Sequence, residues 1–375
     1  MVSVLIFYII VTTLIYFFSI LFFLIGNIVL SEKIENKNFP NISVIIAIKN
    51  GIDSIESIVN DLKEQDYNGV AEFILIDDDS IDGTDIYIKN ISQTDKKFRC
   101  FSSNEGKIEL SHKKKALDVG IENAKYEWLL FTDVDCRLKP TWISAMSQYM
   151  IDKNDYIVGY SEVKQNDLVS TIFQSIDLFM MMVVSRGSIN FKLPLACIGQ
   201  NQAYRKSLYK KIGGFTKIAS HLQGDDSLFM QICIKYKKSS ILFAHDEKSF
   251  VNARQEKTWL NLFRQRIRWA GDARIMWKFN KLFFVIFLST FSIHLFFILG
   301  IISSIFNTNL LMIMVLLITI KFILEYLLFY IGKEKFNYKT TFLNFIFWFI
   351  FHFPYIVLMG VGSFYSNQLG WKNRP

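Results

Sequence analysis

Residues 127–136 read EWLLFTDVDC, an apolar run that ends in two aspartates two positions apart. Such a run is typical of a strand buried in a sheet, and side chains at i and i+2 of a strand point the same way. We therefore expect Asp133 and Asp135 to lie together where the strand ends. Two carboxylates about 6 Å apart repel by roughly 3 kcal/mol at an effective dielectric near 20. A divalent cation would remove that repulsion and keep coordination positions for phosphates. The alternative is a turn in which both side chains cap backbone amides.

Apolar and amphipathic stretches alternate along the chain before this run. Strands are predicted at 42–48, 73–76, 98–102 and 127–132, and helices at 53–65, 82–91, 111–124 and 140–151. The alternation favours an α/β fold with a doubly wound, mostly parallel sheet. Ligands of such sheets bind beyond the carboxyl ends of the strands. Both acidic clusters, Asp77–Asp79 and Asp133–Asp135, follow predicted strands, so we expect a site at that edge.

The composition separates this domain from four apolar blocks. Hydrophobic residues make up 51% of the chain and charged residues only 20%, which is too apolar for an ordinary soluble domain. The blocks are long enough to span a bilayer and lie at about 2–30, 282–306, 310–331 and 341–365. The first lacks a basic start and a cleavage site, so an anchor is expected. We expect an N-terminal transmembrane helix in 1–30, one domain with interfacial helices in 31–281, and a membrane domain of about three helices in 282–375.

The basic residues predict an orientation in the membrane. They gather in 263–281 and in the loop 332–339, whereas the loop 307–309 has none. These patterns place the large domain in the cytoplasm. The composition, rich in Lys, Ile, Asn and Phe, indicates an AT-rich bacterial genome. With the apolar blocks, the expected location is a bacterial inner (plasma) membrane. The basic tail 371–375 does not fit the parity, so either the tail is an exception or the fourth block does not fully cross.

The charge and the cysteines narrow the partners. A formal net charge of +8 favours anionic lipid or phosphorylated substrates. Nucleic acid is a poor alternative, because the Lys and Arg residues are dispersed and many border apolar blocks. The four cysteines show neither CxxC spacing nor His pairing, so no zinc site and no disulfide framework are predicted.

Four further motifs follow the acidic clusters in a fixed order. They are Lys113-x-x-Ala-Leu, Gly199-Gln-Asn, Gly224-Asp-Asp, and Gln265-Arg-Ile-Arg-Trp. Together with DDDSIDGT at 77–84 and DVD at 133–135, this order resembles the inverting nucleotide-sugar glycosyltransferases of family 2. That group includes cellulose, chitin and hyaluronan synthases and ceramide glucosyltransferase. The resemblance covers about residues 41–275 and implies a Rossmann-like GT-A domain flanked by transmembrane helices.

The resemblance implies roles for residues of the donor side. Asp135 would hold the divalent metal, Mg²⁺ or Mn²⁺, with Asp133 nearer the ribose and sugar. Asp78 would contact the nucleotide base, and Lys113 would take part in nucleotide-sugar binding. Two positions depart from the family pattern: Asp79 and His112 each replace a usual glycine.

The resemblance also implies a general base for the acceptor and three further donor-binding residues. Asp226 would be the general base that takes the proton of the acceptor hydroxyl. Gln265, Arg268 and Trp269 would bind the nucleotide sugar. The alternative for these three is an amphipathic helix whose Arg snorkels and whose Trp lies at the headgroups.

Together with the apolar blocks, the resemblance implies a membrane-bound, metal-dependent hexosyltransferase. It would move a sugar from a nucleotide-sugar donor, a UDP-sugar most of all, to a lipid-linked or membrane-proximal glycan acceptor. One alternative is a processive polysaccharide synthase. Another, of a different class, is a non-catalytic membrane scaffold that kept a nucleotide-binding fold.

Two further features have alternatives of their own. Residues 168–185 are apolar apart from Gln174 and Asp177, which predicts either an interfacial helix or a core helix. Lys321 and Glu325 lie four apart within an apolar block. They are either a functional intramembrane pair or a pair that neutralises itself.

Overall fold

The computed structural model describes residues 2–29, 38–166, 168–221, 223–237, 239–305 and 308–369. These residues form two compact units. An α/β unit lies within 31–164 and 196–255, and a helical unit lies within 1–30, 165–195 and 256–369. The basic tail 371–375 and position 307 of the uncharged loop lie outside the described residues.

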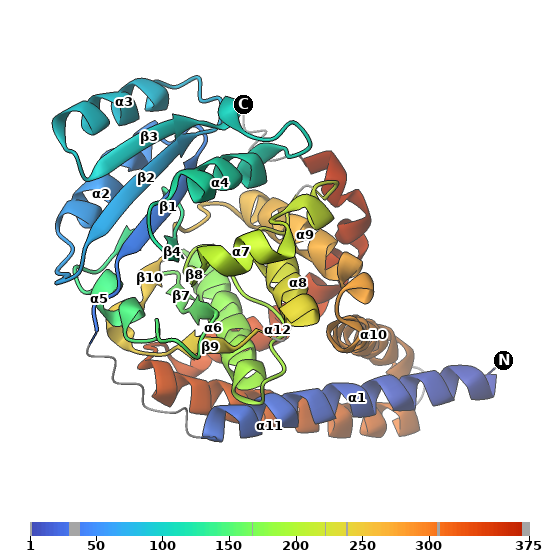
Figure 1. Ribbon diagram of the computed structural model, residues 1–375. Helices are drawn as coiled ribbons and strands as arrows, with labels where there is room; N and C mark the ends of the chain where they lie inside the picture. The colour runs from blue at the N-terminus through green and yellow to red at the C-terminus, as the bar shows by residue number, and fades with distance from the viewer. Residues whose placement is uncertain are drawn as a thin grey trace. The chain divides into compact units, whose positions relative to one another are not determined.

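A seven-stranded sheet forms the centre of the α/β unit (Figure 1). Its order is β3-β2-β1-β4-β8-β6-β9, and only β8 runs antiparallel to its neighbours. The strands are β1 (Ile42–Ile48), β2 (Ala71–Asp77), β3 (Phe98–Ser102), β4 (Trp128–Phe131), β6 (Tyr156–Gly159), β8 (Gln202–Arg205) and β9 (Ile241–Ala244). The predicted α/β fold with a mostly parallel sheet is thus confirmed.

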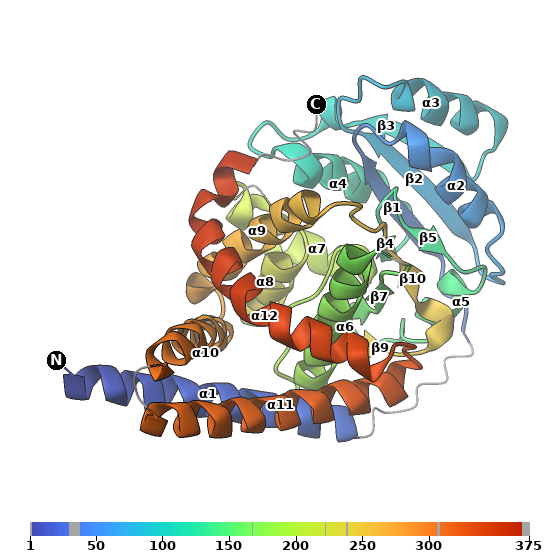
Figure 2. The same ribbon diagram turned by 180° about the vertical axis from the view of Figure 1, so that it is seen from behind.

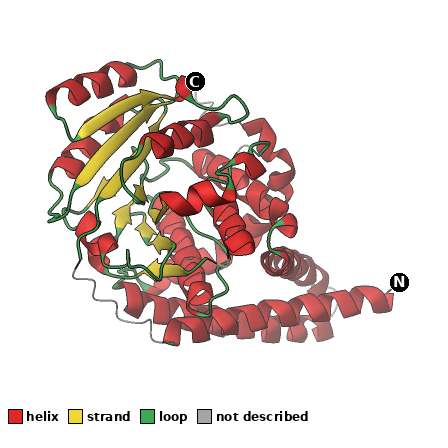
Figure 3. Cartoon of the chain, in the orientation of Figure 1, coloured by secondary structure: helices red, strands yellow, loops and turns green. Residues whose placement is uncertain are grey.

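Burial of the central strands on both faces explains their continuous apolar sequences. β1 lies between β2 and β4, with Ile45 opposite Ile74 on one side and Phe131 on the other. Ile45 and Ile74 have no exposed surface. The helices that follow the strands are α2 (Ile52–Lys63), α3 (Thr84–Thr94), α4 (His112–Asn123) and α5 (Trp142–Ser147) (Figure 3). α5 ends four residues before the predicted end at 151, because the chain tightens there: the amides of Tyr149 and Met150 each donate to the carbonyl three residues back.

Smaller elements complete the α/β unit. A three-stranded sheet has the order β5 (Arg137–Leu138), β10 (Val251–Asn252), β7 (Ser161–Glu162). The remaining helices are α7 (Lys206–Ile212) and α8 (Ser227–Lys237), and the short 3₁₀ turns η1 (Ser103–Glu105), η2 (Thr216–Ile218) and η3 (Glu247–Ser249).

The helical unit contains five helices that are long and apolar enough to cross a membrane. Four correspond to the predicted blocks: α1 (Val2–Ile28), α10 (Lys281–Ser304), α11 (Thr308–Phe336) and α12 (Phe342–Gly362). Figure 2 shows α1 and α11 side by side. The fifth is α6 (Val169–Asn190), whose apolar window is 83% buried, as its core-helix alternative predicts. The unit also holds α9 (Trp259–Ile275), η4 (Met276–Lys278) and η5 (Ser363–Leu369).

Two glycines allow α1 and α6 to cross in contact. A Cβ on Gly26 would lie 2.2 Å from the carbonyl oxygen of Gly187, and a Cβ on Gly187 would lie 2.6 Å from the carbonyl oxygen of Phe23. Asn27 adds polar contacts: its side-chain amide donates to the carbonyl of Val183 at 2.8 Å, and its Oδ1 accepts from Arg186 at 2.9 Å. Small residues and interhelical hydrogen bonds are the usual means of holding apolar helices together.

A buried polar cluster joins further helices of the same unit. Lys321 Nζ lies 2.9 Å from Glu325 Oε2, and both residues are at most 2% exposed. Tyr16 on α1 donates to the other carboxylate oxygen. The pair predicted at i and i+4 therefore forms. The ligand atoms of His294, Glu325 and His352 lie within 4.8 Å of one another. The Lys321 ammonium already neutralises Glu325, however, so a dication here would leave excess positive charge in apolar surroundings.

Candidate active site

The carboxyl ends of the parallel strands carry the acidic clusters, as predicted. Asp133 and Asp135 follow β4 and are both half-buried. Asp78 follows β2, and its amide donates to the carbonyl of Ile48 at the end of β1, at 2.7 Å. Asp78 is 6% exposed, and its Oδ2 has no hydrogen-bond partner among the described residues. A buried carboxylate oxygen left in this way is an acceptor that a ligand can use.

Lys113 joins the donor-side and acceptor-side motifs. Its Nζ lies 2.8 Å from Asp133 Oδ1 and 3.1 Å from Asp225 Oδ2. The lysine side chain is 12% exposed and that of Asp225 is 9% exposed, so these ion pairs are largely removed from water. The two carboxylates hold the pKa of Lys113 above its ordinary value, against the effect of burial. Residues that are distant in sequence thus meet at one ammonium group.

Asp226 completes this group from the start of α8. One of its carboxylate oxygens accepts from the amide of Gly199 at 3.2 Å, and the other accepts from the amide of Ser227. Burial and, next, the charge of Asp225 raise the pKa of Asp226 to about 7, although the amides and Lys113 oppose the shift. A carboxylate with a pKa near neutrality is suited to accept a proton from a hydroxyl.

Lys114 is a part of this region that the sequence analysis did not identify. Its side chain is 1% exposed, and its Nζ donates to the carbonyl oxygens of His221 and of Gln223, the latter at 3.1 Å. It therefore fixes the chain just before the Gly224-Asp-Asp motif. A second lysine beside Lys113 is the only signal in the sequence, and such a signal is ordinarily read as a solvated helix face.

The two departures from the family pattern keep the backbone geometry of glycine. Asp79 has a φ of 53° and His112 a φ of 54°, both in the left-handed region. Asp and His are among the residues that adopt this region most readily after Gly. The Asp79 side chain also accepts from Asn104 at 2.7 Å. Both positions therefore adopt, without glycine, a backbone conformation that favours glycine.

The Gly199-Gln-Asn motif serves the fold through its asparagine. Asn201 Oδ1 accepts from the Trp142 indole at 3.1 Å, and its Nδ2 donates to the carbonyls of Tyr160 and Ser249, each at 2.9 Å. The side-chain amide of Asn201 is thus used for hydrogen bonds that hold the fold together. Gly159 lies against it, since a Cβ there would be 2.3 Å from the side chain of Asn201.

The remaining predicted residues lie in the helical unit, on α9. Gln265, Arg268 and Trp269 are half-buried and, at i, i+3 and i+4, share one side of the helix. Gln265 Nε2 donates to Glu256 Oε1 at 3.3 Å. Within the α/β unit the structure thus brings Asp133 and Asp225 together at Lys113, with Asp226 next to Asp225. The predicted residues of α9 lie in the helical unit.

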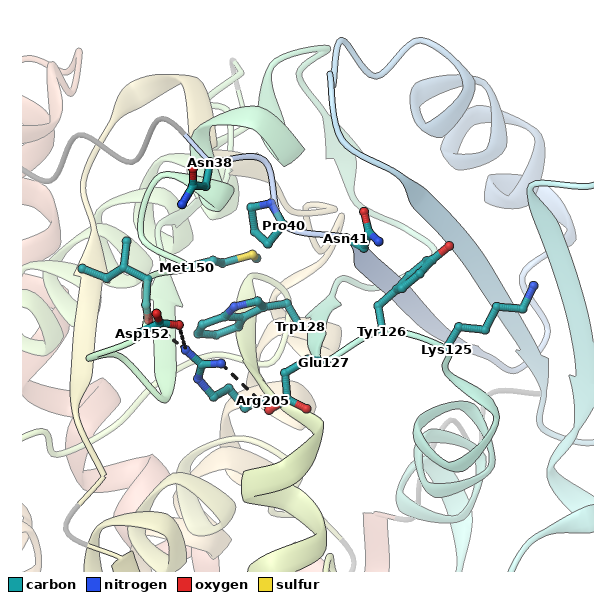
Figure 4. Close-up of a pocket in the computed structure, with 11 residues that line it drawn as sticks. Asn38, Pro40, Asn41, Lys125, Tyr126, Glu127, Trp128, Met150, Asp152 and Arg205 are labelled. Atoms are coloured by element: carbon teal, nitrogen blue, oxygen red, sulfur yellow. Dashed lines mark hydrogen bonds and ion pairs between the residues drawn. The ribbon is translucent and has the colours of Figure 1, made fainter.

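A pocket lies at the opposite edge of the sheet (Figure 4). It is lined by the segments that precede β1 and β4, by Trp128 at the start of β4, by the segment 150–152 after α5, and by Arg205 at the end of β8. Arg205 stacks on the Trp128 ring at 4.6 Å and lies 3.5 Å from Asp152. The acidic clusters lie at the carboxyl ends of the strands, whereas this pocket lies at the amino ends of β1 and β4. It is therefore distinct from the candidate active site.

The residues after β4 fit a divalent cation. Asp133 and Asp135 are both partly open to solvent and offer the hard oxygen ligands that Mg²⁺ and Mn²⁺ prefer. Their charges, after burial, raise the pKa of the neighbouring Cys136 thiol, so negative potential is concentrated here.

Comparison with known proteins identifies the class. Residues 43–213 match the model of glycosyl transferase family 2, and residues 129–361 match that of glycosyl transferase family group 2. The structure resembles that of the mannosyltransferase PcManGT from Pyrobaculum calidifontis, with a TM-score of 0.61, 17% identity, and coverage of 96% of this chain and 98% of the other. The fold is therefore that of a GT-A glycosyltransferase. The chain belongs to glycosyltransferase family 2, which confirms the resemblance predicted from the motifs.

Sequence relatives agree with this assignment. A glycosyltransferase of Haemophilus influenzae, itself uncharacterised, is 26% identical over 254 residues, which are 66% of this chain and 89% of the relative. A probable glycosyltransferase of Sulfolobus acidocaldarius is 27% identical over 202 residues, which are 49% of this chain and 40% of the relative.

Proposed function

We propose that the protein transfers a single sugar, with inversion, from a nucleotide-sugar donor to a lipid-linked or membrane-proximal acceptor. One observation carries this proposal: a single ammonium, that of Lys113, pairs with Asp133 of the donor-side motif and with Asp225 of the acceptor-side motif. The neighbouring Asp226 has a pKa of about 7. Nucleotide and acceptor hydroxyl would thus meet beside one proton acceptor.

The residues divide the chemistry between them. Asp226 takes the proton of the acceptor hydroxyl as its oxygen forms a bond to the anomeric carbon. On the opposite face of that carbon the bond to the diphosphate oxygen breaks, and the electron pair leaves with the nucleoside diphosphate. Asp78 binds the base, and Lys113 holds the carboxylates in register. A divalent cation on Asp135 and Asp133, when bound, would neutralise the developing charge of the diphosphate.

The helical unit supports the proposed setting. Five helices are long and apolar enough to cross a bilayer, which favours an integral membrane protein with a substrate drawn from lipid. PcManGT is described in complex with GDP-mannose and Mn²⁺. A nucleotide sugar and a divalent cation are accordingly the donor and cofactor proposed for this chain, with its α/β unit in the cytoplasm of a bacterium. Gln265, Arg268 and Trp269 are proposed to bind the donor.

The test is a donor panel of UDP- and GDP-sugars with Mn²⁺ or Mg²⁺, scored for released nucleoside diphosphate. Asp135→Ala and Asp226→Asn should each lower turnover at least about hundredfold, by the size of general-base effects. Asp53→Ala is the control, because Asp53 is exposed on α2. Wild-type rates in the first two variants would refute the proposal. Product sizing then distinguishes one added sugar from the ladder that a processive synthase makes.

A further inference from the structure

Arg266 is the most buried residue of its turn of α9, although the Gln-x-x-Arg-Trp motif leaves its position open. It is 4% exposed, whereas Arg264 is exposed and Gln265 is half-buried. A guanidinium removed from water requires a counter-ion and hydrogen-bond acceptors. The contacts of Arg266 therefore show what this burial maintains.

One edge of the guanidinium binds α6. Arg266 Nε donates to Asp177 Oδ2 at 2.9 Å, and the side chain of Asp177 is 7% exposed. Tyr355 on α12 donates to the same oxygen at 3.2 Å. Three helices of the unit thus fix the direction of the Arg266 side chain.

The other contacts of Arg266 are with residues of the motif. Its Nη1 donates to Gln265 Oε1 at 3.0 Å, and its Cζ lies 4.1 Å from the centre of the Trp269 ring. Because Gln265 Oε1 accepts from Arg266, the amide nitrogen must point the other way, where it donates to Glu256 Oε1. Gln174 on α6 in turn holds the backbone of Glu256 with two hydrogen bonds of 2.9 Å.

We infer that Arg266, held by Asp177, is a positioning residue that orients Gln265 and Trp269 for contact with the nucleotide sugar. The inference rests on the proposed function and adds a residue to it. A lysine at this position could keep the ion pair with Asp177 but has neither the second nitrogen that reaches Gln265 nor the plane that lies on Trp269. The substitution Arg266→Lys therefore keeps the charge while removing the contacts with Gln265 and Trp269.

The experiment is a double-mutant cycle on the donor KM, with nucleoside diphosphate release as the assay. Arg266→Lys and Gln265→Ala should each raise the donor KM about tenfold with kcat within about twofold, since both remove ground-state binding contacts. Because Arg266 acts in part through Gln265, the double variant should raise the donor KM by clearly less than the hundredfold of simple additivity. Arg264→Lys is the matched control on the same helix and should leave the KM unchanged.

The outcomes separate this inference from the proposed function. A KM increase of about a hundredfold in the double variant, which is simple additivity, would overturn the inference, as would an Arg266→Lys enzyme that behaves like Arg264→Lys. Absence of release by the wild type with every donor would refute the proposed function and the inference with it. If Arg266→Lys does not fold, Asp177→Asn combined with Arg266→Gln removes both buried charges together and should give the same tenfold increase.

Discussion

Replacing Lys113 by methionine tests the link between the two halves of the site. Methionine fills similar space but has no charge, so Asp133 and Asp225 lose their shared cation and Asp226 loses a nearby positive charge. At 2.8 and 3.1 Å, the attraction in each ion pair is roughly 5–6 kcal/mol before desolvation at an effective dielectric near 20. Removing one partner of a buried pair costs about 3–5 kcal/mol. Because the side chain of Asp133 is 26% exposed, we expect the free energy of unfolding to fall by the lower end of this range, about 3 kcal/mol.

The same change should shift the pH dependence of the reaction. Lys113 lowers the pKa of Asp226, and both side chains lie beside Gly199. Loss of a unit charge at such a range corresponds to about one pKa unit or more. The base of the variant would then be ionised only at higher pH. The midpoint of kcat/KM should move from about 7 to about 8 or above.

The measurement is kcat/KM for donor turnover from pH 5.5 to 9.5, together with denaturant unfolding. Lys113→Arg keeps the charge and should keep the midpoint near that of the wild type. Lys96→Met controls for the substitution itself, because Lys96 is exposed and its side chain makes no ion pair among the described residues. An unchanged midpoint and unchanged stability in Lys113→Met would show that the pairing with Asp225 does not govern the base.

Five further predictions have defined outcomes. In the wild type, kcat/KM should rise about tenfold per pH unit below about 7 and then level off, as Asp226 ionises; a flat profile from pH 5 to 8 would exclude Asp226 as the base. Because the folded pKa is raised, the stability that Asp226 contributes is full below its unfolded pKa near 4 and is lost as the pH rises through about 7, which urea unfolding at pH 5 and 8 can detect. His112→Gly should stabilise the protein by about 1 kcal/mol, since it relieves a positive φ, and a lower melting temperature would contradict this. Gly187→Leu should prevent the contact of α1 with α6 and lower the yield of folded protein in detergent, whereas Gly187→Ala should do so less. Lys321→Met should destabilise more than the double variant with Glu325→Gln, because the single change leaves a buried carboxylate unpaired; equal melting temperatures would argue against a self-neutralised pair.

The strands and their order along the chain were predictable because burial on both faces leaves a plain mark in the sequence. The run 42–48 forms β1 with the predicted ends, and 98–102 forms β3. The acidic turns were predictable for the same reason, since they follow those runs. Asp79 and His112 were recognised as departures from glycine, and the structure shows the positive φ that makes glycine usual there.

The contacts that assemble the site were not predictable, because they depend on the tertiary fold. Lys114 looks like a surface lysine in the sequence but is buried against the loop before Gly224. Arg266 looks like a variable position of a motif but forms an ion pair with Asp177. Pairings between such distant segments follow no sequence period. The early end of α5 likewise depends on local turn hydrogen bonds rather than on hydrophobic spacing.

The Lys113 ammonium is shared by two carboxylates, so the strength of one ion pair depends on the other. A ligand that takes Asp133 out of its ion pair strengthens the pairing of Lys113 with Asp225. Because coupling free energies are reciprocal, a ligand that acts on Asp225 changes binding at Asp133 by the same free energy. Under the proposed function, nucleotide binding near Asp133 and acceptor binding near Asp225 are therefore energetically coupled.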